Sequence, residues 1–334
     1  MLLDSQRNKL LASDIGFSAC GLTQARPVSQ ERTAAVRQWL AEGCHAGMDY
    51  LERNAELMAD PTKLVPGART IVSLAVNYFT PDDPNEGFAQ PKSDEKGDFQ
   101  APSPDGMGKN AWKIARYARG TDYHDVVKNM LRRLMYELHL EDGTDGRCFV
   151  DTAPIDEKYW AQQCGLGWKG RNSQLIIPGA GSYFFLGELV LLYEADHYDE
   201  PMESHCGSCH RCLDACPAQA LRGDGELDAR RCLSYLTIEH RGDLPEGTGE
   251  QMGSCFYGCD RCNDCCPWNQ RFASPTTITE LQPRPALLAM TPTDWMQLDV
   301  ERYRELFRKS AVKRAKFEGL TRNIRAISHS SQSQ

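Results

Sequence analysis

The stretch Cys206–Pro217, CGSCHRCLDACP, decides the fold of the region around it. Its four cysteines are spaced C-x2-C-x2-C-x3-C, and a proline follows the last one. A second group, GCDRCNDCCPWN, starts at Gly258 and again contains Cys-Pro. Thiolates at such short spacings hold metals, either as structural zinc sites or as iron–sulfur clusters. We favour iron–sulfur clusters, because a zinc site does not need the repeated Cys-Pro arrangement.

The spacing also predicts which cysteines hold which cluster. In two-cluster bacterial ferredoxins, three closely spaced cysteines bind one [4Fe–4S] cluster, and a fourth, before proline, crosses to the other. The first cluster is therefore predicted to have the ligands Cys206, Cys209, Cys212 and Cys266. The second is predicted to have Cys216, Cys259 and Cys262, with Asn269 where its next ligand would fall. Either Cys232 or Cys265 must complete it, and we favour Cys232 because Cys265 adjoins a ligand of the first cluster.

Composition indicates a globular protein of several domains. The chain has 334 residues, of which 41% are hydrophobic and 14 are cysteines. The longest apolar run, Tyr183–Tyr193, contains Glu188 and is too short to cross a bilayer, so we expect a buried strand there. The N-terminus shows no basic segment followed by an apolar one. We therefore expect a cytoplasmic protein whose thiols stay reduced and bind metal.

Three regions are predicted along the chain. Residues 1–198 form a catalytic core with helices at 31–43 and 122–140, apolar strands at 70–79 and 183–193, and a mobile, proline-rich loop at 81–110. Residues 199–272 form a ferredoxin-like domain for two [4Fe–4S] clusters. Residues 273–334 form a linker and a basic, helical C-terminal region.

Charge is unevenly distributed between these regions. The whole chain carries −8, but residues 306–325 hold seven Lys or Arg against one Glu and so carry +6. Residues 326–334 contain no charged residue, which leaves −14 on residues 1–305. An acidic body with a basic end indicates a polyanionic partner that is held at that end.

Several long strings resemble the epoxyqueuosine reductases, cobalamin-dependent iron–sulfur enzymes of queuosine-tRNA maturation. The strings are IARYARGTDYH (114–124), the stretch 150–189 that begins VDTAPIDEKYW, RRCLSYLTIEHRG (230–242) and YGCDRCNDCCPWNQ (257–270). The resemblance extends from about residue 43 to residue 323 and places Cys232 at the missing cluster ligand. It implies an α+β cobalamin-binding core resembling reductive dehalogenases and nitroreductases, followed by the ferredoxin-like domain and a helical C-terminus.

The resemblance also implies a bound cobalamin. DYHDVV begins like the D-x-H-x-x-G motif whose histidine binds cobalt, but Val127 stands where glycine is required, so we expect no histidine ligand. The glycine-rich strings 165–173 and 179–187 are expected to surround the corrin, although without the resemblance they would indicate tight turns. The predicted contacts are Asp151, Lys169, Asn172, Ser173, Ser182 and Leu186.

Asp151 is the candidate proton donor. It ends the apolar run of FVDTAP, a position where an aspartate before threonine is more often a helix or turn cap, but the resemblance reverses this preference and favours the catalytic role. Removing the epoxide oxygen takes two electrons, and that oxygen must be protonated before it leaves as water. An apolar, desolvated pocket would raise the pKa of Asp151 enough for it to donate a proton near neutrality.

The partners implied are a tRNA that carries epoxyqueuosine and an external low-potential electron donor, flavodoxin-like or ferredoxin-like. The basic segment is expected to follow the phosphate backbone as a helical stretch, with the tRNA-binding residues Lys313, Arg314, Lys316 and Arg322. Otherwise, the tRNA would dock near Lys169 and Arg171. Two rival functions are a reductive dehalogenase, which would usually carry an export signal, and a simple electron carrier, which would need only residues 200–270.

Overall fold

The computed structural model describes residues 2–82 and 112–331, so the loop predicted at 81–110 lies almost wholly outside the described residues. Its centre is an antiparallel sheet with the strand order β2-β3-β8-β5. These strands are β2 (Ala19–Gln24), β3 (Thr70–Asn77), β8 (Phe184–Leu191) and β5 (Gly146–Phe149). The two long apolar runs are the central strands β3 and β8, as predicted, because both of their faces are covered.

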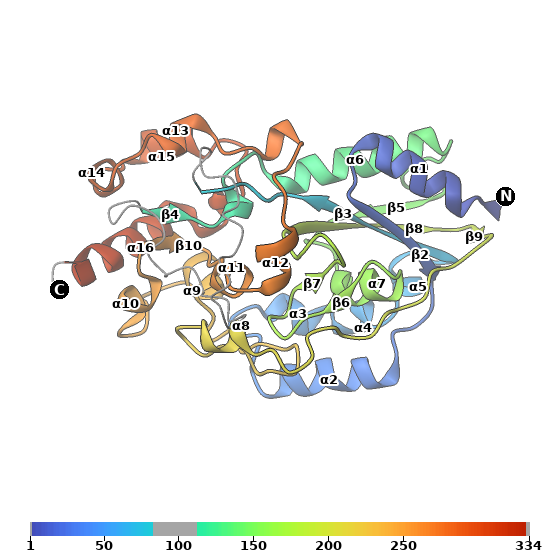
Figure 1. Ribbon diagram of the computed structural model, residues 1–334, viewed down its shortest axis with the longest axis horizontal. Coiled ribbons are helices and arrows are strands. Elements are labelled where there is room, and N and C mark those ends of the chain that lie inside the picture. Colours follow the sequence, from blue (N-terminus) through green and yellow to red (C-terminus); the bar gives the residue numbers. More distant parts are fainter. Residues whose placement is uncertain (1, 83–111, 332–334) are drawn as a thin grey trace, which may run out of the picture.

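Helices cover both faces of this sheet (Figure 1). On one face lie α1 (Ser5–Ile15) and α6 (Tyr123–Glu137), which pack against each other and share a core with Val72, Leu74 and Leu189. On the other face lies α7 (Glu157–Gln163), beside the hairpin β6 (Trp168–Lys169) and β7 (Leu175–Ile176). An antiparallel sheet packed with helices is the α+β class that the sequence predicts.

Short elements complete the first region. Near the N-terminus these are β1 (Leu2–Leu3), α2 (Gln30–Ala41), α3 (Asp49–Arg53), α4 (Ala55–Met58) and α5 (Pro61–Leu64). Further along are β4 (Lys113–Ile114), η1 (Arg116–Ala118) and β9 (Glu194–Ala195), which pairs with β1. In the described part of the chain, no helix is long and apolar enough to span a membrane.

The cysteine-rich region consists of short helices and one strand. They are α8 (Arg211–Asp214), α9 (Leu233–Ile238), α10 (Thr248–Met252), β10 (Cys255–Tyr257), α11 (Arg261–Asp264) and α12 (Pro267–Phe272). Helices α8 and α11 each begin inside a cysteine group and pack against each other. Proline at the first position of α12 explains one of the Cys-Pro pairs, since proline is well suited to start a helix.

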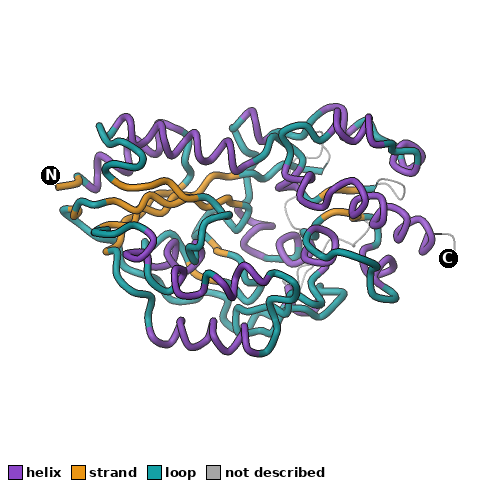
Figure 2. Tube along the Cα trace, turned by 180° about the vertical axis from the view of Figure 1, so that it is seen from behind, coloured by secondary structure: helices purple, strands orange, loops and turns teal. Residues whose placement is uncertain are grey.

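The C-terminal region packs on the cysteine-rich region and shares its core (Figure 2). It contains η2 (Thr279–Leu281), α13 (Pro285–Leu288), α14 (Pro292–Met296), α15 (Val300–Leu306), η3 (Ala311–Ala315) and α16 (Lys316–Ser331). Phe256 and Leu236 from the cysteine-rich region meet Phe307 and Leu320 from these helices in one buried cluster.

The basic segment is not one continuous helix, which corrects the sequence-based expectation. Lys309 and Lys316 both have positive φ, 52° and 61°, so the backbone turns between α15 and η3 and again before α16. Ser310 lies between α15 and η3 and caps η3 through its side chain. The basic side chains therefore project from three different elements rather than from one helical face: Arg308 and Lys309 from the turn after α15, Lys313 and Arg314 from η3, and Lys316, Arg322 and Arg325 from α16.

Candidate functional site

Asp151 follows strand β5 and has a backbone conformation that few residues adopt. Its φ is 46°, in the left-handed region, which aspartate tolerates better than most residues do. Its backbone N–H donates to Oε1 of Glu157, the first residue of α7. This hydrogen bond ties the turn to the helix behind it and fixes where the Asp151 carboxyl is presented.

Two donors from the start of α6 converge on one oxygen of Asp151. The Tyr123 hydroxyl donates to Oδ2 over 2.6 Å, and Nε2 of His124 lies 3.1 Å from the same atom. Asp122, the N-cap of α6, holds the other ring nitrogen of His124 at 2.7 Å. The Tyr123 ring stacks on both Phe185 and His124, with centroids 4.2 and 4.1 Å away. The start of α6 therefore forms a rigid support for the carboxyl.

These contacts overturn the expected direction of the Asp151 pKa. Burial alone would raise the pKa, but hydrogen bonds from His124 and Tyr123 and the nearby positive charges lower it below its usual value. The side chain also keeps 53% of its surface exposed, because it faces an open cavity and not an apolar pocket. The Asp151 carboxyl is therefore ionised at neutral pH in this arrangement.

The protons of this cluster are held by neighbours of Asp151. Burial would lower the pKa of His124, but hydrogen bonds to Asp122 and Asp151 raise it to about 9. Burial and the negative charge of Asp151 raise the pKa of Glu157 to about 8. At neutral pH, His124 is therefore cationic and Glu157 is neutral.

The cavity in front of Asp151 has a volume of about 270 Å³. Its lining comes from α3 and the turn after it (Tyr50, Asn54), from residues 151–158, from Lys169 and Ser173, and from Glu226 of the cysteine-rich region. The site thus lies where the first region meets the cysteine-rich region.

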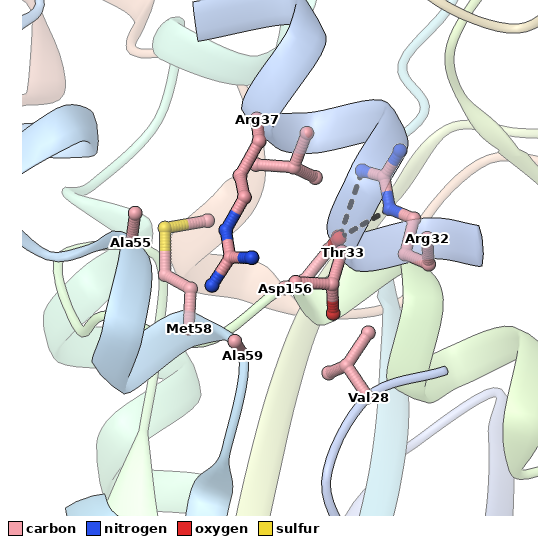
Figure 3. Close-up of a pocket in the computed structure, with 9 residues that line it drawn as sticks. Val28, Arg32, Thr33, Arg37, Ala55, Met58, Ala59 and Asp156 are labelled. Carbon is pink, nitrogen blue, oxygen red and sulfur yellow. Dashed lines mark hydrogen bonds and ion pairs between the residues drawn. The ribbon is translucent and has the colours of Figure 1, made fainter. Parts of the chain in front are cut away.

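A partly buried ion-pair network joins the two regions beside this cavity. Arg32 of α2 binds Asp156 at 2.8 Å and also contacts Glu226, which in turn accepts from Lys169. Figure 3 shows Arg32 bound to Asp156 next to a smaller pocket, about 20 Å³, that also borders Val28 and Met58. Because Arg32 and Asp156 line both spaces, this pair forms the wall between them.

Three of the predicted cobalamin contacts line the cavity, namely Asp151, Lys169 and Ser173. The other three lie elsewhere. Asn172 donates to Asn263, and Ser182 hydrogen-bonds with Asn263 and Asn269, all as buried groups. Leu186 belongs to the sheet core. Asn172 and Ser182 therefore join the first region to the cysteine-rich region, Leu186 packs within the first region, and none of the three lines the cavity.

The glycine-rich strings also pack against protein atoms at several positions. A Cβ at Gly167 would stand 2.0 Å from the Ile176 carbonyl oxygen, and one at Gly181 would stand 2.2 Å from Asn269 Oδ1. Gly187 faces Val127 and Leu131 of α6. At these places close packing of the chain requires glycine, in contrast to the expected cradle for a corrin.

The cysteine thiols form two neighbouring sets. The pKa of Cys212 is raised mainly by burial and further by the negative charges of nearby Cys266, Cys206 and Cys209. The pKa of Cys262 is likewise raised mainly by burial and further by the charges of nearby Cys259, Cys232, Cys265 and Cys216. Cys265 is also near Cys212 and Cys266, so it lies between the sets. Among the described residues, no three His, Cys, Asp or Glu side chains meet closely enough to hold a single metal ion.

The predicted tRNA-binding residues differ in how free they are. Lys313 and Lys316 are exposed. Arg314 forms two hydrogen bonds with Glu239 and lies over the ring of Tyr50, 6.0 Å from its centroid, at the rim of the cavity. Arg322 is engaged by the carbonyl oxygens of residues 236, 240 and 242. Arg322 therefore holds α16 in place and does not fit its predicted contact with phosphate.

Sequence reasoning missed the partners of Asp151. Asp122 carries the signal of a helix N-cap, and His124 stands in a motif that we considered only as a cobalt ligand. Neither signal indicates contact with a residue 27 positions further along the chain. That contact arises because β5 and α6 pack on each other.

Comparison with known proteins gives consistent similarities. Residues 59–152 match the family model described as "Epoxyqueuosine reductase QueG, DUF1730", and residues 205–269 match a "4Fe-4S double cluster binding domain". An epoxyqueuosine reductase of Leadbetterella byssophila is 38% identical over 321 residues, which cover 96% of this chain and 97% of that protein. One of Cellulophaga algicola is 36% identical over 317 residues, covering 95% of each chain.

Solved structures show the same similarity in three dimensions. The epoxyqueuosine reductase of Streptococcus thermophilus superposes with a TM-score of 0.80 at 28% identity, over 96% of this chain and 80% of that one. A crystal structure of an epoxyqueuosine reductase with an epoxyqueuosine-modified tRNA-Tyr stem loop also gives 0.80, at 26% identity and the same coverage. The similarity therefore includes the core, the cysteine-rich region and the C-terminal helices.

Proposed function

Because this chain belongs to the epoxyqueuosine reductase family, we propose that it reduces epoxyqueuosine to queuosine at the anticodon wobble position of tRNA. The observation that carries this proposal is the position of Asp151, in a cavity bounded by both the sheet core and the cysteine-rich region. A substrate bound there would be close to the two-cluster domain that supplies electrons. A relative bound to an epoxyqueuosine-modified stem loop supports tRNA as the partner.

Electrons are proposed to enter through two [4Fe–4S] clusters from an external low-potential donor, flavodoxin-like or ferredoxin-like. Cys206, Cys209, Cys212 and Cys266 would hold one cluster, and Cys216, Cys232, Cys259 and Cys262 the other. Two features support this assignment. Cys232 lies near Cys216, and Cys216 Sγ accepts from the Ala220 N–H over 3.2 Å, the kind of hydrogen bond that tunes cluster potential.

The donor set around the cavity fits a cobalamin. A corrin carries amide groups at its edge, and Asn54, Lys158, Lys169 and Ser173 offer donors and acceptors that match them. Asp151, Lys169 and Ser173 are the residues that we propose to hold it. When bound, cobalamin would supply cobalt as the centre from which electrons reach the epoxide carbon. The protein part of the reaction is to position the nucleoside, exclude water and deliver protons.

Asp151 is proposed as the group that contacts the departing oxygen and protonates it. Its Oδ2 is occupied by Tyr123 and His124, which leaves Oδ1 to face the cavity. The left-handed turn that presents this atom is held by Glu157. Since the isolated carboxyl is ionised at neutral pH, its proton must come from a neighbour.

The tRNA is proposed to approach from the C-terminal region. Lys313 and Lys316 would contact phosphates, and Arg314, which reaches Tyr50 at the rim, marks where the basic segment meets the cavity. The wobble base would leave the anticodon stack to enter the cavity, as bases do in enzymes that react on them.

The test is anaerobic purification with quantitation of iron, sulfide and cobalamin, followed by turnover on tRNA carrying epoxyqueuosine and nucleoside analysis of the product. The proposal predicts about eight irons per chain from two clusters, bound cobalamin and conversion to queuosine. Loaded protein that leaves epoxyqueuosine unchanged would refute it.

A further inference from the structure

The proposed reduction consumes two protons, whereas one carboxyl can hold only one. Both C–O bonds of the epoxide break, and two electrons from the low-potential donor form the carbon–carbon double bond. The oxygen leaves as water once it has taken up two protons. A site with Asp151 alone would deliver one proton and then need a second before the reaction could finish.

We propose that His124 supplies protons to Asp151, with Asp122 behind it, so that the three side chains form a relay that ends at the substrate. This inference rests on the proposed function. His124 acts through Asp151 and does not itself contact the reacting oxygen, so its role is that of a positioning residue.

The geometry assigns the direction of this relay. Nδ1 of His124 lies 2.7 Å from Asp122 Oδ1, and Nε2 lies 3.1 Å from Asp151 Oδ2. Ionised carboxylates only accept hydrogen bonds, so both ring nitrogens must carry hydrogen, which makes the imidazole cationic. The Nε2 hydrogen points at Asp151 Oδ2 and is the one available for transfer. Rotation of the carboxyl group about its Cβ–Cγ bond then carries this proton from Oδ2 to the side that faces the cavity, where the departing oxygen takes it up. Asp122 is itself fixed, because it accepts the His124 backbone N–H as the cap of α6.

The charged and titratable groups around this pair favour the cationic imidazole. The groups that interact with it or with Asp151 are Asp122, Tyr123, Glu157, Lys158 and Arg314, together with Tyr50, Tyr117 and Glu188 near Asp151. The two carboxylates that contact His124 outweigh the effect of burial and hold its pKa near 9. His124 is thus charged at neutral pH and stands beside an ionised acceptor.

Tyr123 contacts the same oxygen but is a poor source of protons. Burial and the adjacent Asp151 raise the pKa of its phenol far above the ordinary value, so it keeps its hydrogen. Its function in the relay is to orient Asp151. His124, in contrast, has 30% of its side chain exposed and can regain a proton from water after each transfer.

The first test is a pH profile of single turnover, with reduced, fully loaded enzyme and epoxyqueuosine-containing tRNA. Wild type should react at a constant rate up to about pH 9 and slow above it. His124→Gln keeps a side-chain donor for Asp151 but has no proton to release. Its rate should be about a hundredfold lower at pH 8 and should fall with rising pH across the neutral range. His197→Gln, at an exposed histidine after β9, is the matched control and should follow wild type.

A His124→Gln variant with the wild-type rate and profile would overturn the relay. A loss of rate that is equal at every pH would also overturn it, since that result indicates a structural role. Failure of turnover in all forms, wild type included, would refute the proposed function instead, and the relay would then be judged by titration.

The titration does not depend on turnover. In the full chain labelled with ¹³C at histidine Cε1, the resonance that His124→Gln removes should titrate near pH 9 in wild type. Asp151→Asn should lower that midpoint, because one of the two carboxylate partners is lost. A wild-type midpoint at the ordinary value of about 6.5 would overturn the relay.

Discussion

Arg116 offers the clearest energetic test of how the cysteine-rich region is attached. Its side chain is only 9% exposed, and it reaches Asp82 at 2.8 Å, Asp264 at 2.6 Å and Asp260 at 3.4 Å. Asp260 and Asp264 frame α11, the helix inside the second cysteine group. Arg116→Met would leave these two carboxylates without their cation, while Asp82 would keep Arg119.

The expected loss follows from the burial of these partners. Breaking a buried pair by removing one member costs about 3–5 kcal/mol. We expect about 3 kcal/mol, because Asp264 keeps 40% of its side chain exposed. For a chain longer than 250 residues, 1 kcal/mol corresponds to about 2 °C or less, so the melting temperature should fall by up to about 6 °C.

The assay is differential scanning calorimetry of anaerobically loaded protein at one scan rate, because unfolding with loss of clusters is irreversible. Arg132→Met is the matched control, since Arg132 pairs with Asp142 at 3.2 Å while 53% exposed. Such exposed pairs contribute about 0–1 kcal/mol. Equal shifts for the two variants would refute the view that the Arg116 network holds α11 to the core.

Three further predictions concern the cluster ligands, Glu157 and the basic segment. Cys265→Ser should leave iron content and both EPR signals intact, whereas Cys232→Ser should degrade one cluster; the reverse result would refute the assignment. The native protein keeps a proton on Glu157 up to about pH 8, whereas the unfolded chain releases it near 4.5, so stability falls as pH rises between these values. Glu157→Gln removes this dependence. The melting temperature of the variant minus that of wild type should therefore increase from pH 5 to pH 8, and a difference that stays constant with pH would contradict the raised pKa of Glu157. Reversing Lys313 and Lys316 to Glu should weaken tRNA binding and reduce the log–log salt slope by about two, while unchanged binding across a salt titration would move the docking surface elsewhere.

The sequence predicted those parts of the fold whose causes are local or repeated. Apolar runs marked β3 and β8, and the helix expected at 122–140 corresponds to α6. Cysteine spacing indicated a two-cluster region, which the match at residues 205–269 supports. In each case the signal and the structure it predicts involve residues close together in the chain or a fixed motif.

The site could be predicted only in part, because its chemistry depends on contacts between distant segments. Asp151 was expected in an apolar pocket, but α6 brings Tyr123 and His124 to it and reverses the direction of its pKa shift. Asn172 and Ser182 were expected at a cofactor, but Asn263 and Asn269, over 80 residues away, bind them. Arg322 contributes to a local excess of charge, yet backbone carbonyls of α9 and the following loop occupy its guanidinium.

The most direct test of the central claim compares wild type with Asp151→Asn in one measurement. Both proteins, loaded with iron, sulfide and cobalamin to equal content, are reduced and mixed with tRNA that carries epoxyqueuosine, and the nucleosides are analysed by mass spectrometry. We predict that wild type forms queuosine and that Asp151→Asn, with an amide of the same size, is slower by at least about a hundredfold. Equal formation of queuosine by the two proteins would contradict the claim that Asp151 protonates the departing oxygen of the epoxide.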